Sequence, residues 1–498
     1  MKKVIITSPI YYANNKLHLG HVYTNVICDS YCRFYKKNCF EVFFTTGMDE
    51  HGDKVFLSAK EKNMPIDLFL DNITKDTLDL WKKYNIEFTN FIRTSDQQHI
   101  KTVKDIFFYF FKKKIIYTSN YEGYYSLKDE AFLSKKELKN LKNKDNLVFK
   151  KEESFFLKIE KQKELLKEIK KRLLPKNKVK ELEKNFFSDL KDLSITRENS
   201  KNSISLEINN KNLNIYVWFD ALINYLSAFN FSFRNQKFFD FWNSKDTKII
   251  QFIGKEIVRF HTIYWFLILK YLKLKIPNNI ISHGWLLLKN EKMSKSEKNI
   301  ICPHELLKKF SSDEIRYFLT KNFSLKNDFS FSIDSIANTK KQDLIFVFSN
   351  LVTRTLKMIE KYFNGQIKMN LNNTQVKLGN KWINEVIKFY ETYKISASIN
   401  FLLKKMSLIN KKIQLKEPWK LYNQKKMKSL EKILLDCFFK IFLIVFLLSP
   451  VLVTSYKNFI LMFEKNNFFE ELNFLNFINL INNKEIKIKE ISYLFKND

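Results

Sequence analysis

Two short motifs, far apart in the sequence, carry side chains suited to binding a nucleoside triphosphate. The first is the string HLGH at His18–His21, which places two imidazoles around a glycine where the backbone can pass close to a phosphate or a base. The second is KMSKS at Lys292–Ser296, which places two ammonium groups three residues apart with a serine between them. Imidazole and ammonium N–H groups stabilise negative charge that develops on phosphate oxygens. The two motifs therefore indicate chemistry at a phosphate.

The elements around the first motif are typical of an open α/β sheet. Residues Lys3–Ser8 are mostly apolar and β-branched, as in a parallel strand buried on both faces, and a helix is predicted to start near His18–Gly20. A second apolar strand is predicted at Glu41–Thr46, followed by the polar run Gly47–Gly52. Open α/β sheets bind their ligands at the carboxyl ends of the strands. We therefore predict a Rossmann-type parallel-sheet domain of the α/β class, with its site at that edge.

Residues 113–213 depart from this pattern. Short strands are predicted at Tyr121–Ser126 and Ser154–Ile159, around a charged helical stretch at Lys161–Glu183. This segment is predicted to be a small connective insertion between two halves of the sheet domain. The α/β pattern then resumes with three predicted strands: Ile215–Phe219, Ile249–Gly254 and Asn279–Leu287.

The last third of the chain is predicted to be an all-α helical bundle. From Lys341 onward strand patterns vanish, and apolar residues recur at helical spacing, as at Phe348, Leu351 and Leu356, nearly to Asp498. We expect five regions: the two halves of the Rossmann-type sheet domain at 1–112 and 214–300, the insertion at 113–213, a linker at 301–340 and the helical domain at 341–498.

The charge of the chain is strongly positive. The 498 residues include 86 Lys and Arg against 53 Asp and Glu, which gives a formal net charge of +33. An excess of this size favours a polyanionic partner such as nucleic acid. An AT-rich genome predicts the same excess, since Lys, Asn, Ile and Phe are abundant while Gly totals 8 and Pro 7. Both explanations stay open, and they are compatible.

Composition argues against several classes of protein. The five cysteines form no CxxC pair and no disulfide framework, so buried free thiols are expected and no metal site. The N-terminus runs directly into a predicted strand, without a signal or transit segment. The apolar run Ile441–Tyr456 contains Pro450 and is shorter than the ~20 residues of a membrane span, so a buried bundle helix is predicted. A cytoplasmic protein that does not enter the membrane is expected.

The two motifs, in this order, resemble the signature of class I aminoacyl-tRNA synthetases. Longer strings over nearly the whole chain resemble the methionyl-tRNA synthetase family. These strings are Thr7–Asn14, Thr45–Gly52, Tyr216–Tyr225, Phe252–Lys255, Arg259–His261 and His283–Trp285, with Asn350, Arg354 and the dipeptide Pro418-Trp419 in the helical part. The resemblance implies ATP-dependent formation of methionyl-adenylate and transfer of methionine to tRNA(Met), for translation initiation and elongation, with Mg²⁺ accompanying ATP.

The resemblance also implies site residues. Methionine has an unbranched thioether, so aromatic rings, which accept sulfur contacts worth ~0.3–1.5 kcal/mol, suit its pocket. The expected methionine-binding residues, with Asp49 for the ammonium group, are Ile10, Tyr12, Asp49, Trp218, Tyr225, Ile257, His261 and Trp265. The expected ATP-binding residues, of which both histidines and both lysines are expected to be catalytic, are His18, Gly20, His21, Gly254, Glu256, Lys292, Ser294 and Lys295. Asn350, Arg354 and Trp419 match anticodon-reading positions. For any single aromatic residue, core packing is the alternative.

Three features depart from the family pattern or bear on partners. Glu256 stands where Asp is usual and Lys298 where Gly is usual, which puts the ribose contact and the hinge of the lysine loop in doubt. Many relatives hold zinc on cysteine pairs in the insertion, but Tyr121–Glu130 contains no cysteine, so no structural zinc is expected. No dimerisation domain is visible after the helical bundle, so a monomer is expected.

Other functions are less compatible with the sequence. Leucyl, isoleucyl and valyl enzymes add an editing domain, for which the insertion is too small, and the cysteines are wrongly placed for the zinc of cysteinyl enzymes. Two alternatives stay open: a different nucleotidylyltransferase of the HxGH superfamily, and a synthetase-derived protein that binds tRNA without catalysis. The helical domain disfavours the first, and the intact histidines and lysines of both motifs disfavour the second.

Overall fold

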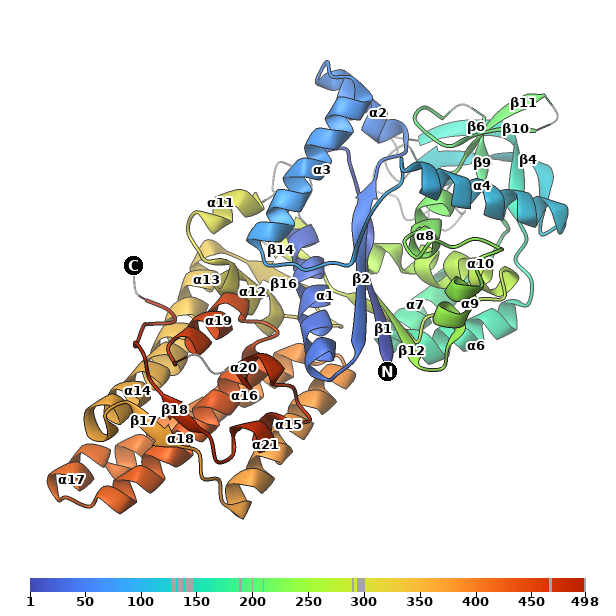
Figure 1. Cartoon of the computed structure of the whole chain (residues 1–498). Helices are drawn as coiled ribbons and strands as arrows, with labels where there is room; N and C mark the ends of the chain where they lie inside the picture. The colour runs from blue at the N-terminus through green and yellow to red at the C-terminus, as the bar shows by residue number, and fades with distance from the viewer. Residues whose placement is uncertain are drawn as a thin grey trace.

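The computed structural model is built around a six-stranded parallel sheet (Figure 1). It describes residues 1–126, 131–132, 138, 147–187, 190–198, 200–208, 210–288, 291–292, 301–464 and 468–496. The strands, in their order across the sheet, are β3 (Asn90–Arg93), β2 (Glu41–Asp49), β1 (Lys3–Tyr12), β12 (Thr247–Gly254), β13 (Asn279–His283) and β7 (Leu173–Leu174). All neighbouring pairs are parallel, which confirms the predicted α/β fold class.

From β1 the chain proceeds outward to β2 and β3 on one side, and from β12 it proceeds outward to β13 on the other, where the earlier strand β7 forms the edge. The strand order therefore reverses between β1 and β12, and the crevice at such a point is where open α/β sheets bind ligands. The helices of this part are α1 (Leu19–Lys37), α2 (Asp53–Glu61), α3 (Ile66–Lys83), α4 (Gln97–Lys112), α8 (Val217–Ser227), α9 (Gln236–Asn243) and α10 (Trp265–Tyr271), with a 3₁₀ turn η2 (Lys255–Ile257) and a π-helical turn η3 (Phe260–Tyr264).

The segment predicted as an insertion forms two small sheets, ordered β5-β4-β6-β8 and β10-β11-β9. Its elements are β4 (Ile116–Ser126), β5 (Ala131–Phe132), β6 (Leu147–Leu157), α6 (Gln162–Arg172), α7 (Lys176–Asn185), β8 (Leu193–Ser194), β9 (Thr196–Arg197), β10 (Ser205–Ile208) and β11 (Lys211–Ile215). The single helical stretch predicted at Lys161–Glu183 is wrong, because β7 separates α6 from α7. Pro175 disfavours helical backbone at the preceding Leu174, and β7 instead pairs with the edge of the central sheet.

The strand predicted at Ile215–Phe219 is also wrong. β11 ends at Ile215 in a small antiparallel sheet, and helix α8 begins at Val217. The aromatic and β-branched residues at its start are typical of a strand. The segment is nevertheless a helix, because helical spacing allows Phe219, Leu222 and Leu226 all to be fully buried.

A small region links the sheet domain to the helices. Strands β14 (Leu286–Leu288), β15 (Glu291–Lys292) and β16 (Phe329–Phe331) form a sheet ordered β15-β14-β16. Helices α11 (Pro303–Leu307), α12 (Ser312–Lys321) and α13 (Ile333–Thr339) complete this region.

The carboxyl-terminal part is helical, as predicted, apart from one strand pair. Its helices are η4 (Lys340–Ser349, π-helical), α14 (Asn350–Phe363), α15 (Asn373–Glu391), α16 (Ile395–Lys416), α17 (Pro418–Asn423), α18 (Met427–Leu448), α19 (Val453–Leu461), α20 (Phe468–Glu471) and α21 (Phe477–Ile481). Strands β17 (Gln366–Lys368) and β18 (Glu485–Lys487) pair antiparallel, so the prediction that strands vanish after Lys341 is wrong at this point. The pairing joins segments more than a hundred residues apart, which local periodicity does not reveal. Within the described part of the chain, no helix combines the length and apolar character that crossing a membrane requires.

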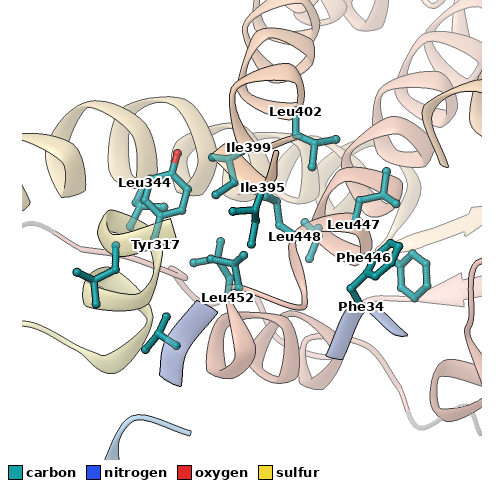
Figure 2. Packing of buried hydrophobic residues seen from close by; sticks show 14 of the residues in the cluster. Phe34, Tyr317, Leu344, Ile395, Ile399, Leu402, Phe446, Leu447, Leu448 and Leu452 are labelled. Atoms are coloured by element: carbon teal, nitrogen blue, oxygen red, sulfur yellow. The ribbon is translucent and has the colours of Figure 1, made fainter. Parts of the chain in front are cut away.

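The sheet domain and the helical part share one hydrophobic core. Figure 2 shows Phe34 of α1 in the same cluster as Ile395 of α16 and Phe446 of α18. Phe34 also stacks on Tyr390 of α15, with ring centroids 4.2 Å apart. The two parts are therefore packed together through apolar side chains and not merely tethered by the chain.

Arg316 of α12 is fully buried at this junction. Its guanidinium donates to Asp29 Oδ2 of α1 at 2.6 Å, to the Tyr84 carbonyl at 3.1 Å and to the Pro450 and Val451 carbonyls at 3.0 Å each. One side chain thus joins the sheet domain to the segment between α18 and α19.

Candidate active site

A cavity of about 960 Å³ opens at the carboxyl ends of β1, β2, β12 and β13, at the point where the strand order reverses. The sequence-predicted residues that line it are His18, Gly20, His21, Ile10, Tyr12, Asp49, Trp218, Tyr225, Gly254, Glu256, Ile257 and His261. The fold therefore brings the predicted phosphate-binding and methionine-binding residues to one space.

The two histidines of the HLGH motif form the start of α1. His18 caps the helix, with its Nδ1 accepting the Gly20 N–H at 3.0 Å, and His21 Nδ1 accepts the His18 N–H at 3.1 Å. Their rings stack with centroids 3.8 Å apart. A nitrogen that accepts a hydrogen bond carries no proton, so the proton of each neutral ring is on Nε2. Both residues are thereby fixed as Nε2–H donors at the positive end of a helix, which suits an anion.

Gly20 is required by its neighbour. A Cβ on Gly20 would lie 2.8 Å from His18 Cε1, which would push the imidazole out of its capping position. The sequence suggested that this glycine lets adenine approach the backbone. The structure shows a more direct reason for the glycine, because the absence of a Cβ leaves room for the His18 ring in its capping position.

Tyr225 and His261 form a hydrogen-bonded pair in the predicted methionine pocket. His261 Nδ1 lies 3.1 Å from the Ile257 carbonyl, to which it donates, so Nε2 accepts from the Tyr225 hydroxyl at 2.8 Å. Burial lowers the pKa of His261 to about 4, so the ring is neutral at physiological pH. The pair thus presents an uncharged wall, as an apolar thioether requires.

The aromatic residues divide into those that line the cavity and one that does not. Trp218 stacks on Phe260, with centroids 3.8 Å apart and ring planes within 2°. Trp265 is fully buried behind the wall, 5.5 Å from the Tyr225 ring, and its Nε1 donates to Gln251 Oε1 at 2.9 Å. The structure therefore places Trp265 outside the cavity, as support for Tyr225.

Glu256 and Trp285 line the cavity in contact with each other. The Trp285 indole donates to Glu256 Oε2 at 2.6 Å, and a Cβ on Gly254 would lie 2.6 Å from the same oxygen. Lys255 lies over the Trp285 ring at 3.8 Å and pairs with Asp328 at 2.6 Å. The longer side chain of Glu256 is thereby held back over Gly254 by contacts within this chain.

Several lining residues were missed by sequence reasoning. His283 of β13 lies in the cavity wall with its Nε2 3.1 Å from Thr24 Oγ1, and burial lowers its pKa. Asn14, Lys54 and Trp285 also line the cavity. Asn14, His283 and Trp285 belong to the strings Thr7–Asn14 and His283–Trp285, and each lies at or just after the end of a strand. Their position at a strand end could have identified them as lining residues.

Of the KMSKS motif, the structure describes only Lys292. Lys292 ends β15, which pairs with β14 beside the cavity residue Leu286. Ser294, Lys295 and Lys298 lie outside the described residues.

The predicted anticodon-reading residues lie in the helical part, on α14 and α17. The Arg354 guanidinium is 5.3 Å from the centroid of the half-buried Trp419 ring, and exposed Asn350 begins α14 one turn before Arg354. Asn350 and Arg354 of α14 and Trp419 of α17 therefore lie close enough to contribute to one binding surface.

Cys28, Cys32 and Cys437 are buried free thiols, and Cys39 and Cys302 are exposed. In the portion of the chain that is described, no three His, Cys, Asp or Glu side chains group so as to hold a metal ion.

Comparison with known proteins identifies the family. Residues 4–144 and 136–356 match the family model of class I (M) tRNA synthetases. The methionine–tRNA ligase of Ureaplasma parvum is 34% identical over 474 residues, covering 92% of this chain and 91% of that protein. The methionine–tRNA ligase of Mycoplasma pneumoniae is 35% identical over 468 residues, covering 91% of each.

Solved structures agree with the fold. Methionyl-tRNA synthetase of Mycobacterium tuberculosis, in complex with methionyl-adenylate, superposes with a TM-score of 0.89 at 24% identity over 100% of both chains. The resemblance predicted from the HLGH and KMSKS motifs is confirmed by the family match and by the relatives. The chain belongs to the methionyl-tRNA synthetase family of class I aminoacyl-tRNA synthetases.

Proposed function

We propose that this chain, as a methionine–tRNA ligase, performs both steps of its reaction at the cavity. In the first step a carboxylate oxygen of methionine attacks the α-phosphorus of ATP, and pyrophosphate leaves. In the second step a ribose hydroxyl at the 3′ end of tRNA(Met) attacks the acyl carbon of methionyl-adenylate, and AMP leaves. The product serves translation initiation and elongation. The observation that carries this proposal is the meeting of the HLGH imidazoles with Asp49 and the aromatic wall in one cavity.

Positioning and charge stabilisation supply the catalysis, because neither step needs a protein nucleophile. His18 and His21 donate from Nε2 to phosphate oxygens, and Gly254 and Glu256 line the ribose side. Lys292 and Lys295 neutralise the departing pyrophosphate, and Ser294 between them contributes to ATP binding. Mg²⁺ accompanies ATP through its phosphate oxygens, for which a dedicated protein cage is not needed.

Methionine binds between Asp49 and the uncharged wall. Asp49 takes the ammonium group at the end of β2, while Trp218 and the Tyr225–His261 pair surround the thioether. Ile10, Tyr12 and Ile257 complete the pocket from strand β1 and turn η2, and Trp265 supports Tyr225 from behind.

We assign the remaining roles by region. Residues 1–112 and 214–300 form the catalytic domain, 113–213 the connective insertion, 301–340 the linker and 341–498 the anticodon-binding domain. Asn350, Arg354 and Trp419 read the anticodon, because unpaired RNA bases stack on aromatic and guanidinium planes. The protein works as a cytoplasmic monomer.

Pyrophosphate exchange tests this function. With ATP and labelled pyrophosphate, exchange should require methionine and should not be supported by leucine, valine, isoleucine or cysteine. Charging of tRNA(Met) should follow when the tRNA is added. Exchange supported by a different substrate would favour another nucleotidylyltransferase, and tRNA binding without exchange would favour a non-catalytic protein.

We also propose that the insertion is stable without zinc, since Tyr121–Glu130 contains no cysteine. The purified protein is expected to hold no stoichiometric zinc and to keep its exchange activity after treatment with a chelator, once Mg²⁺ is replenished. Elemental analysis checks the metal content. One tightly bound zinc ion per chain would contradict the proposal.

A further inference from the structure

A chain of buried polar side chains lies behind the wall of the cavity. Asp220 of α8 accepts hydrogen bonds from His51 Nδ1 at 2.7 Å and from His99 Nε2 at 2.6 Å. Ser227, at the end of α8, places its hydroxyl 2.7 Å from His99 Nδ1. Asp220 and His99 are 1% and 0% exposed, and none of the four residues lines the cavity.

These contacts join three elements that carry or flank the proposed methionine site. His51 follows Asp49 by two residues at the end of β2, and Asp220 follows Trp218 by two residues in α8. His99 lies in the first turn of α4. Asp220 therefore connects the loop of the proposed ammonium ligand to the helix that carries the aromatic wall.

The carboxylate at the centre of this chain is ionised although it is buried. Burial alone would raise the pKa of Asp220, but the interactions with His51 and His99 outweigh burial and hold the pKa at about 2. Burial lowers the pKa of His51, but the interaction with Asp220 dominates and raises it above its ordinary value. Hydrogen bonds to an ionised carboxylate are short and directional, so they hold the elements that supply the donors at a defined separation from α8. A buried charge held by polar partners adds little net stability compared with apolar packing, so a positioning role is a better explanation for Asp220.

We propose that Asp220 is a positioning residue for methionine. It does not touch the substrate, and it sets the distance between Asp49 and the Trp218–Tyr225 face of α8 through His51 and His99. This inference rests on the proposed methionine site. The phosphate-binding end depends on the His18 cap of α1, whose hydrogen bonds are formed within the HLGH motif itself.

The test is Asp220→Asn, which keeps the size of the side chain and removes its charge. In pyrophosphate exchange we expect KM for methionine to rise about tenfold or more, since small displacements of a positioned group have large kinetic effects. KM for ATP is expected to stay within about twofold, because the His18 cap is untouched. Ser227→Ala removes only the outer link through His99, so it is expected to raise KM for methionine by a smaller factor. It also provides the same readout if Asp220→Asn does not fold.

Asp313→Asn is the matched control. Asp313 is also a buried carboxylate, 2% exposed, and it accepts the backbone N–H groups of Val453, Thr454 and Ser455 at the start of α19. Its replacement should lower the melting temperature without changing KM for methionine in the folded enzyme. If Asp220→Asn and Ser227→Ala behave like Asp313→Asn, or if both KM values rise equally, the inference is wrong.

A second variant separates this inference from the site on which it rests. Asp49→Asn should raise KM for methionine if Asp49 binds the ammonium group. If Asp49→Asn raises KM for methionine and Asp220→Asn does not, only the positioning role fails. If Asp49→Asn leaves KM for methionine unchanged, the proposed methionine site itself is wrong.

Discussion

Replacing Lys295 by alanine is expected to lower kcat for methionine-dependent pyrophosphate exchange by about 100- to 1,000-fold, the usual effect of losing one preorganised charge-stabilising donor. The ammonium group acts on negative charge that builds up as pyrophosphate departs. KM for methionine should change little, because the pocket of Trp218, Tyr225 and His261 lies on other elements. An interaction made only in the transition state lowers kcat and kcat/KM together.

Two variants control this prediction. Lys295→Arg keeps the charge and should recover part of the lost rate. Lys308→Ala removes an exposed lysine at the end of α11, outside the assigned set, and should leave kcat near that of the wild type. Single-turnover measurement of adenylate formation separates chemistry from product release. A rise in KM at unchanged kcat would contradict the assigned role, because it would show that Lys295 binds ground state and transition state equally.

Replacing Trp419 by alanine is expected to reduce charging of tRNA(Met) and to leave pyrophosphate exchange near the wild-type rate. Loss of one base-stacking contact costs ~1–3 kcal/mol, roughly 5- to 150-fold in binding. Exchange requires only the sheet-domain cavity, whereas Trp419 lies on α17 of the helical part, beside the Arg354 guanidinium. Both activities and the melting temperature should be measured on the same preparations.

Trp382→Ala is the control for a structural tryptophan. Trp382 lies on α15 of the same helical part, is 6% exposed, and has the Lys405 ammonium 5.4 Å from its ring centroid. Truncation of a buried tryptophan leaves a cavity that typically costs ~3–5 kcal/mol of stability. Exchange and charging should then decline together with the melting temperature. If Trp419→Ala shows this same pattern, Trp419 is a core residue and the anticodon assignment is wrong.

Local sequence patterns predicted the elements whose burial is uniform along the chain. The apolar β-branched runs at Lys3–Ser8 and Ile249–Gly254 are strands β1 and β12, since a strand covered on both faces must be apolar at every position. The HLGH string predicted the start of α1 because its chemistry is local. Each histidine ring bonds to a backbone N–H within three residues of itself.

Local sequence patterns gave the wrong secondary structure or site where contacts with distant segments determine the fold. Tyr216–Phe219 is as compatible with a strand as with a helix, and the packing of α8 against the buried core settled the choice. The pairing of β17 with β18 and of β7 with β13 depends on partners more than a hundred residues away. Trp265 has the same residue type as Trp218, and only the arrangement of α10 behind Tyr225 places it outside the cavity.

The sequence by itself determined the family, the sheet fold and the chemical groups available for the reaction, because motif residues act through their own functional groups and short-range backbone bonds. Tertiary structure alone decided how those groups are held. Arg316 joins α1 to the segment before α19, and Asp220 joins α8 to α4 and to the loop after β2, through contacts between residues 121 to 287 positions apart. Such contacts carry no local signal, because a buried charge is stable only when the folded chain supplies its partner.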